Sequence, residues 1–144
     1  MISQVFQDCE HRPELFRWFG PIAIDDLRSW CRARELSLPE DLVLLLSRTG
    51  GGDLFESETI LGPHFGYETG DDWDSANRFH HERGLPRDFH LFHVGFVLSA
   101  VKDGGYTVLS SDYAPGTTYR SLEEWYLRCI RAEFQDRYGL NRPE

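Results

Sequence analysis

Apolar residues recur every three or four positions near the end of the chain, which is the spacing of an amphipathic helix. The stripe consists of Leu122, Trp125, Tyr126, Cys129, Ile130 and Phe134. Ser121 comes directly before the stripe, and Glu124 follows three residues after Ser121. This is the spacing of a capping box, in which the serine hydroxyl accepts a hydrogen bond from the amide three residues later. The pattern predicts a closing helix that begins after Ser121, buries this stripe and ends at Tyr138 and Gly139.

Four earlier segments carry helix signals, at 13–19, 25–35, 37–49 and 72–83. The first opens with a proline, the second with Asp25 or Asp26 as a cap, the third with a capping box of Ser37 and Glu40, and the fourth with Asp71 or Asp72 as a cap. Glycines at the ends of several are suited to a left-handed C-cap. Short runs rich in β-branched and aromatic residues predict strands between and after them. These runs occupy 54–61, 89–94, 96–102, 106–111 and 117–120.

The order and spacing of these elements predict the fold class. Asp103-Gly104-Gly105 is a hairpin turn signal, and the short connections between the later strands favour antiparallel pairing. We predict an α+β fold in a single domain over 1–144. It should contain a mainly antiparallel sheet of about four to six strands, with helices packed on one face and around the edge.

Composition agrees with a globular protein. The 144 residues are 40% hydrophobic and 27% charged, and a chain of this length can bury a core without disulfides. The longest apolar run, 42–46, is too short to cross a bilayer, and the first residues show no secretory signal. The three cysteines form no C-x-x-C pair. We therefore expect a cytoplasmic protein without disulfides or membrane contact.

Charge narrows the possible partners. Fifteen lysines and arginines against 24 acids give a net charge of −9, which disfavours nucleic acid. No lysine or arginine lies between Arg48 and Arg78, so we interpret this stretch as a surface for a basic protein partner. The candidate residues are Asp53, Glu56, Glu58, Tyr67, Glu68, Asp71, Asp72 and Asp74. The alternative is a solvated rim in which Asp71 or Asp72 only caps a helix.

Motifs that carry catalysis are absent from the sequence. It contains no G-x-S-x-G, no phosphate loop, no G-x-G-x-x-G and no H-E-x-x-H. The glycines at 50–52 follow a predicted helix, so we interpret them as its terminator. Glu56 and Glu58 lie on one face of a predicted strand, and a hydrolase that uses them is a less favoured alternative.

The six histidines lack the paired ligand spacing of a closed zinc site, so we predict neither a metal nor a cofactor. His80 and His81 are neighbours on a predicted helix, and His90 and His93 are three apart on a predicted strand, so each pair diverges. The alternative is a zinc site made from one member of each pair and a further ligand such as Asp74.

Several short motifs follow one another along the chain. They are Leu-Pro-Glu-Asp-Leu at 38–42, Arg-Thr-Gly-Gly-Gly at 48–52, Leu-Gly-Pro at 61–63, Gly-Leu-Pro at 84–86, Phe-His-Val-Gly at 92–95 and Tyr-Arg-Ser-Leu-Glu-Glu-Trp at 119–125. Together they resemble the SUKH superfamily, which includes the Smi/Knr-type cell-wall assembly regulators and many bacterial proteins. The resemblance covers roughly residues 22–134.

The resemblance implies protein binding rather than catalysis. Bacterial members are commonly immunity proteins, which bind a cognate toxin domain and block it, and other members are regulators that act through protein contacts. An acidic inhibitor suits a basic, nuclease-type toxin, because opposite charges speed association. We therefore expect a bacterial immunity protein, monomeric or weakly dimeric, with a regulatory or scaffold protein of the same family as the alternative.

Overall fold

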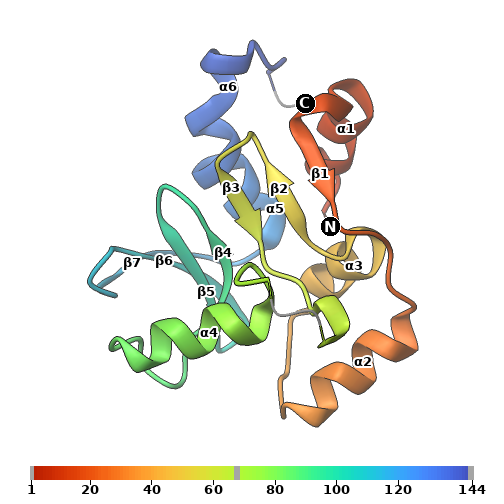
Figure 1. Cartoon of the computed structure of the whole chain (residues 1–144). Helices are drawn as coiled ribbons and strands as arrows, with labels where there is room; N and C mark the ends of the chain where they lie inside the picture. The colour runs from red at the N-terminus through yellow and green to blue at the C-terminus, as the bar shows by residue number, and fades with distance from the viewer. Residues whose placement is uncertain (1, 67–68, 143–144) are drawn as a thin grey trace.

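The computed structural model describes residues 2–66 and 69–142, and a seven-stranded antiparallel sheet forms its centre (Figure 1). The strands are β1 (Phe16–Trp18), β2 (Gly52–Leu54), β3 (Glu58–Ile60), β4 (His90–Val94), β5 (Leu98–Lys102), β6 (Gly105–Leu109) and β7 (Pro115–Tyr119). Each strand pairs with the next one along the chain, so spatial order follows sequence order. The predicted α+β class is confirmed, but the prediction of about four to six strands was too low.

One additional strand comes from a segment that was predicted to be helical. In 13–19, only Pro13–Leu15 forms a single 3-10 turn, and β1 follows directly. Phe16 is buried, Arg17 is exposed and Trp18 is half-buried, which is the alternation of a strand with one face on the core. The proline signal was correct for one turn, but the aromatic residues after it pair with β2 instead of continuing a helix.

The second additional strand comes from 54–61, which was predicted as one strand. The chain reverses there, so β2 and β3 form a hairpin. Phe55 and Glu56 make the reversal with φ of 51° and 69°, in the left-handed region that side chains other than glycine seldom adopt. Neither residue is a typical turn former, so these two positions carry no local signal that predicts the hairpin.

The helices are α1 (Gln4–His11), α2 (Ile24–Ala33), α3 (Glu40–Thr49), α4 (Trp73–Glu82), α5 (Leu122–Trp125) and α6 (Ala132–Tyr138), with a 3-10 turn η2 at His64–Gly66. A π-helical turn, Tyr126–Arg131, joins α5 to α6 into the predicted closing helix. Helix α1 was not predicted. Its buried residues are Val5 and Asp8, so it has no apolar stripe that the sequence could reveal.

Caps explain where these helices begin. As predicted, the Asp72 side chain accepts a hydrogen bond from the amide of Ser75, and Ser121 accepts one from the amide of Glu124. The predicted capping box at Ser37 is wrong, because α3 begins after Pro39 without a side-chain cap. The carboxylate of Glu40 instead binds Arg28 of α2, at 3.1 Å.

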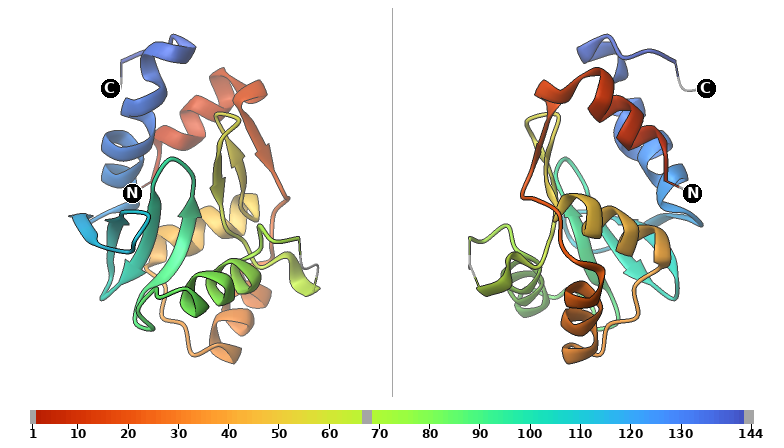
Figure 2. Two further views of the ribbon diagram at one scale, coloured as in Figure 1. Left: turned by 60° about the vertical axis from the view of Figure 1, so that its left-hand side comes forward. Right: turned by 90° about the vertical axis from the view of Figure 1, so that its right-hand side faces the viewer.

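Helices cover both sides of the sheet, as the side view shows (Figure 2). Helix α3 and the closing helix lie on one side, and α4 lies on the other. The predicted stripe of the closing helix is buried except for Cys129, which is half-buried. Leu42, Leu45 and Leu46 of α3 join the same core cluster. No helix in the described ranges is both long and apolar enough to cross a membrane.

Helix α4 takes the place of a strand where β3 ends. The pairing of β3 with β4 stops at His93, so the backbone of Leu91 has no strand partner on that side. The side chain of Asn77 replaces it: its amide donates to the Leu91 carbonyl at 3.0 Å, and its oxygen accepts from the Leu91 amide at 2.7 Å. This two-sided contact fixes α4 beside the sheet and sets the position of the segment before it.

Candidate functional site

The predicted acidic residues fall into three groups in the structure. Tyr67 and Glu68 lie outside the described residues. Glu58 and Asp72 are buried, with 1% and 3% of their surfaces exposed, so the prediction that both face a partner was wrong. The remaining candidates are exposed or half-exposed, and these are Asp53, Glu56, Asp71 and Asp74.

Glu58 is held by hydrogen bonds inside the protein. Its carboxylate lies 2.9 Å from Nε2 of His93 and accepts from the Ser57 hydroxyl at 2.7 Å. The amide of Phe96 also donates to it, at 3.2 Å. Burial alone raises the pKa of Glu58, but the hydrogen bonds from His93 and Ser57 outweigh it and hold the pKa below its usual range.

The other nitrogen of His93 continues this chain of hydrogen bonds. The indole N–H of Trp125 can only donate, and it donates to Oγ of Ser99 at 2.9 Å. The ionised Glu58 carboxylate can only accept, so the Nε2–H of a neutral His93 donates to it at 2.9 Å. Nδ1 of His93 then accepts from the Ser99 hydroxyl, also at 2.9 Å. Each nitrogen and oxygen in this series of hydrogen bonds, from Trp125 to Glu58, has a partner when His93 is neutral. Burial lowers the pKa of His93, which favours that state.

Serine, histidine and carboxylate together resemble a nucleophilic triad, but this set is closed. Ser99 and His93 have no exposed surface, and the serine oxygen already accepts from Trp125. A nucleophile must reach its substrate, and this one cannot. The set therefore has a structural role, because its hydrogen bonds join β3, β4, β5 and the closing helix. The same burial separates Glu58 from exposed Glu56, so the two cannot share an open cleft as a hydrolase pair.

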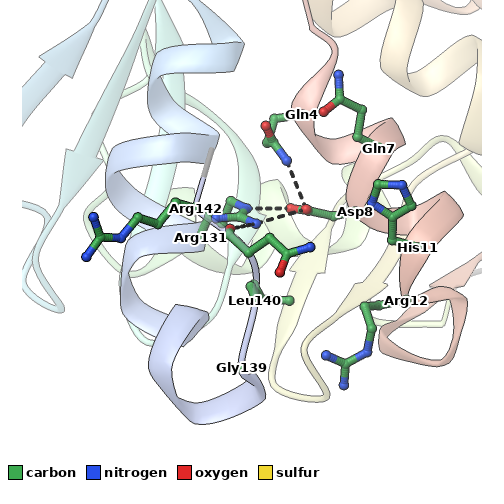
Figure 3. Close-up of a pocket in the computed structure, with 10 residues that line it drawn as sticks. Gln4, Gln7, Asp8, His11, Arg12, Arg131, Gly139, Leu140 and Arg142 are labelled. Carbon is green, nitrogen blue, oxygen red and sulfur yellow. Dashed lines mark hydrogen bonds and ion pairs between the residues drawn. The ribbon is translucent and has the colours of Figure 1, made fainter. Parts of the chain in front are cut away.

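A second buried polar cluster joins the two ends of the chain (Figure 3). The carboxylate of Asp8 accepts from Nε of Arg131 at 2.7 Å, and from the hydroxyl of Tyr126 at 2.6 Å. Gln4 donates to the same carboxylate at 3.0 Å. A hollow of about 260 Å³ lies over this cluster. Because Arg131 also donates to Gln135 and to the backbone carbonyl of Asn141, its guanidinium is held by contacts within the fold.

The exposed acids do not form one surface. Asp53 and Glu56 belong to the β2–β3 hairpin, which points to one end of the molecule, whereas α4 lies toward the other (Figures 1 and 2). Asp53 accepts from the hydroxyl of Thr59 at 2.9 Å. Asp71 and Asp74 lie at the start of α4, and Asp74 binds Arg34 of α2 at 2.6 Å. The hypothesis of one continuous acidic site therefore needs correction.

The group at α4 belongs to a larger surface that includes α2 and η2. We define the α2–α4 face by its exposed and half-exposed acids and its exposed aromatic residues. Its members are Asp25, Asp26, Asp71, Asp74, Phe19 and Phe65. Phe19 and Phe65 are 54% and 50% exposed, the largest fractions among the large apolar side chains of the described residues. Phe19 stacks on the ring of His64 in η2, with centroids 4.2 Å apart.

The acids of α2 lie outside the stretch between Arg48 and Arg78, so the predicted partner surface did not include them, although the helix itself was predicted at 25–35. Asp25 and Asp26 were interpreted as helix caps, but α2 begins after Ala23 without any side-chain cap. Both acids are exposed in the first turn instead, where the helix dipole favours them. Two adjacent acids at the start of a predicted helix are the sequence signal that could have added Asp25 and Asp26 to the partner surface.

Comparisons and ligand chemistry add no further site. A comparison with models of protein families finds no match. A search of curated proteins finds none either. Among the described residues, no three histidine, cysteine or acidic side chains gather as metal ligands would. The α2–α4 face, defined above by its exposed residues, therefore remains the candidate site.

Proposed function

We propose that this chain is a non-catalytic protein-binding domain of the SUKH type, and that it acts as an immunity protein. Its partner is a cognate toxin domain with a basic, nuclease-type surface. The observation that carries the proposal is the α2–α4 face, where exposed aromatic side chains lie among carboxylates. The series of short motifs supports the SUKH assignment, and the net charge of −9 supports a positively charged partner.

The two kinds of side chain have different roles in binding. Carboxylates steer a basic partner toward the face and raise the association rate, most strongly at low salt. Aromatic residues that lose contact with water at the centre of an interface account for much of the affinity. Phe19 and Phe65 fit this second role, because half or more of each side chain is exposed in the free protein.

The direct test is neutralisation of the toxin. The chain should be co-expressed with the toxin domain that is encoded beside it, and growth of the host should be restored. We expect the purified pair to bind with an association rate that falls steeply as salt is added. A neighbouring toxin whose activity is unchanged by this chain contradicts the proposal.

Charge reversal identifies the face that binds. Changing Asp25, Asp26 and Asp71 to lysine should slow association about ten-fold or more and flatten its salt dependence. The matched control changes Asp53 and Glu56 to lysine on the hairpin, which should have a smaller effect. Both sets are exposed, so the fold should be retained, and circular dichroism checks this. Lysines in the first turn of α2 oppose the helix dipole, so this variant should be slightly less stable, which denaturation measures. If the hairpin variant slows association more, the partner binds elsewhere than on the α2–α4 face.

A further inference from the structure

A hollow of about 380 Å³ lies on the α2–α4 face, between α2 and η2. Asp26, Ser29 and Trp30 of α2 line one side, and Phe65 lines the other. Its walls therefore combine two aromatic rings with one carboxylate. That combination suits a planar cation, which can stack on a ring while it pairs with the acid.

Trp30 already binds one guanidinium within the chain. The Cζ atom of Arg34 lies 4.4 Å from the centroid of the Trp30 ring, and the Arg34 side chain then reaches Asp74. Trp73 meets the same indole edge-on, with centroids 5.7 Å apart. This site thus shows, with the protein's own residues, that an arginine is stable between an indole and a carboxylate at this surface.

The indole N–H of Trp30 is unusual. It is a buried side-chain donor without a hydrogen-bond partner among the described residues. Buried donors of this kind are uncommon in native proteins, where nearly all have a partner. The nitrogen itself is buried, so its N–H is a probe of contacts made at the indole ring and not a donor to an occupant of the hollow.

The backbone of η2 holds the aromatic wall in place. His64 and Phe65 have φ of 51° and 37°, so the ring of Phe65 remains exposed beside α2 while His64 turns inward and is buried. Phe19 covers the imidazole of His64. The contact between Phe19 and His64 thus fixes the residue next to Phe65 before any partner arrives, which lowers the ordering cost of binding.

Charges around the hollow favour a cation but do not all attract it. Asp25 and Asp26 are exposed in the first turn of α2. Arg28 is bound to Glu40, at 3.1 Å. Arg32 opposes the acids, because its guanidinium donates to Oγ of Ser29 at 2.9 Å and so lies beside the hollow.

From this geometry we propose that the hollow receives an arginine side chain of the basic partner. The guanidinium stacks on Phe65 and pairs with the carboxylate of Asp26. Lysine fits less well, because its ammonium is a compact and strongly hydrated charge without a flat face. This inference rests on the proposed function, and it names the residue of the partner that anchors the complex.

The test uses the full chain and two peptides, nona-arginine and nona-lysine, which carry equal charge. We expect nona-arginine to bind about three-fold or more tightly than nona-lysine. In NMR spectra, the indole N–H signal of Trp30 should shift and saturate with nona-arginine. Equal affinity for both peptides, or an unmoved Trp30 signal, would falsify the proposal even where both peptides bind.

Three variants and a matched control locate the effect. Phe65→Ala and Asp26→Asn should each weaken nona-arginine binding about three-fold, and Asp26→Asn should also reduce its salt dependence. Arg32→Gln should strengthen binding, because it removes the opposing charge. The control is Phe79→Ala: Phe79 is 49% exposed on α4 and does not line this hollow. If Phe79→Ala weakens binding as much as Phe65→Ala does, the arginine does not occupy the hollow.

These results are separable from the toxin test. A toxin that is neutralised equally well by the Phe65→Ala and wild-type chains would refute the arginine anchor and leave the proposed function intact. A chain that neutralises no toxin but still selects nona-arginine through Phe65 would refute the immunity function and support the hollow as an arginine site.

Discussion

Glu56 and Glu58 stand two positions apart in the sequence and have different roles in the folded protein. Glu56 is exposed on the β2–β3 turn, and Glu58 is enclosed with His93 at 2.9 Å. A Cβ atom at Gly95 would lie only 1.9 Å from the Glu58 carboxylate, so the turn after β4 is fitted closely around it. Such a carboxylate contributes to the fold and is not available to a partner.

Removing the Glu58 carboxylate should therefore reduce stability. Glu58→Ala leaves the His93 N–H and the Phe96 amide without their acceptor and opens a cavity, so we expect a loss of about 2–4 kcal/mol in the free energy of unfolding. Chemical denaturation measures this directly. The control Glu56→Ala should change it by less than about 0.5 kcal/mol. Equal values for the two variants would mean that Glu58 is not enclosed.

His93 should make stability depend on pH. Burial lowers its pKa below the ordinary value of about 6.5, although hydrogen bonding to Glu58 opposes the shift. The unfolded chain therefore takes up a proton at higher pH than the folded protein does. The free energy of unfolding should be nearly constant between about pH 7 and 8 and should fall as the pH drops below about 6.5.

Denaturation at pH 7.5 and 5.5 measures this loss, which cannot exceed about 1.4 kcal/mol per pH unit for one group. His93→Gln should reduce it without abolishing it, because burial also lowers the pKa of His80 and His90. A His93→Gln protein with the full wild-type pH dependence would contradict this role for His93.

At the scale of the elements, the closing helix should account for much of the stability. Trp125 is 1% exposed and donates to Ser99, so Trp125→Ala should cost about 3–5 kcal/mol. Ser121→Ala removes only a cap and should cost about 1 kcal/mol. Both values come from denaturation curves. A Trp125→Ala protein as stable as the wild type would show that the closing helix does not contribute to the stability of the core.

Helix α1 should depend on one carboxylate. Asp8→Ala leaves the buried guanidinium of Arg131 without its counter-ion, and we expect a loss of about 3–5 kcal/mol. The matched control Gln7→Ala changes an exposed residue of the same helix and should be nearly neutral. If both variants unfold at the same denaturant concentration, α1 does not depend on this pair.

Elements whose signals are local could be predicted from the sequence. The caps of α4 and α5 depend on residues three positions apart, and the Asp103-Gly104 turn joins two adjacent strands. Strand β1 was missed because its partner, β2, lies more than thirty residues later in the chain. The same reason hid the contact between Glu58 and His93, which are 35 positions apart. Periodicity cannot report such pairings.

Charge acts at the scale of the whole molecule. The net charge is −9 at pH 7, and the sequence isoelectric point is about 5.1. We expect solubility to be lowest near pH 5, where repulsion between molecules is weakest. Light scattering across pH 4 to 8 measures this. Equal scattering across that range would show that net charge does not control association between copies of this chain.

The contact between Asp8 and Arg131 joins residues 123 positions apart, and this separation bears on synthesis. Each strand pairs with the one made just before it, so the sheet can grow as the chain leaves the ribosome. Helix α1 is made first, but its buried carboxylate gains its counter-ion only when the closing helix has been translated. Until then α1 is held by contacts with earlier parts of the chain, such as the hydrogen bond from the Trp18 indole to the Cys9 sulfur at 3.2 Å. A nascent chain that is stalled or truncated before Arg131 should therefore hold α1 less firmly and present it more readily to proteases and chaperones.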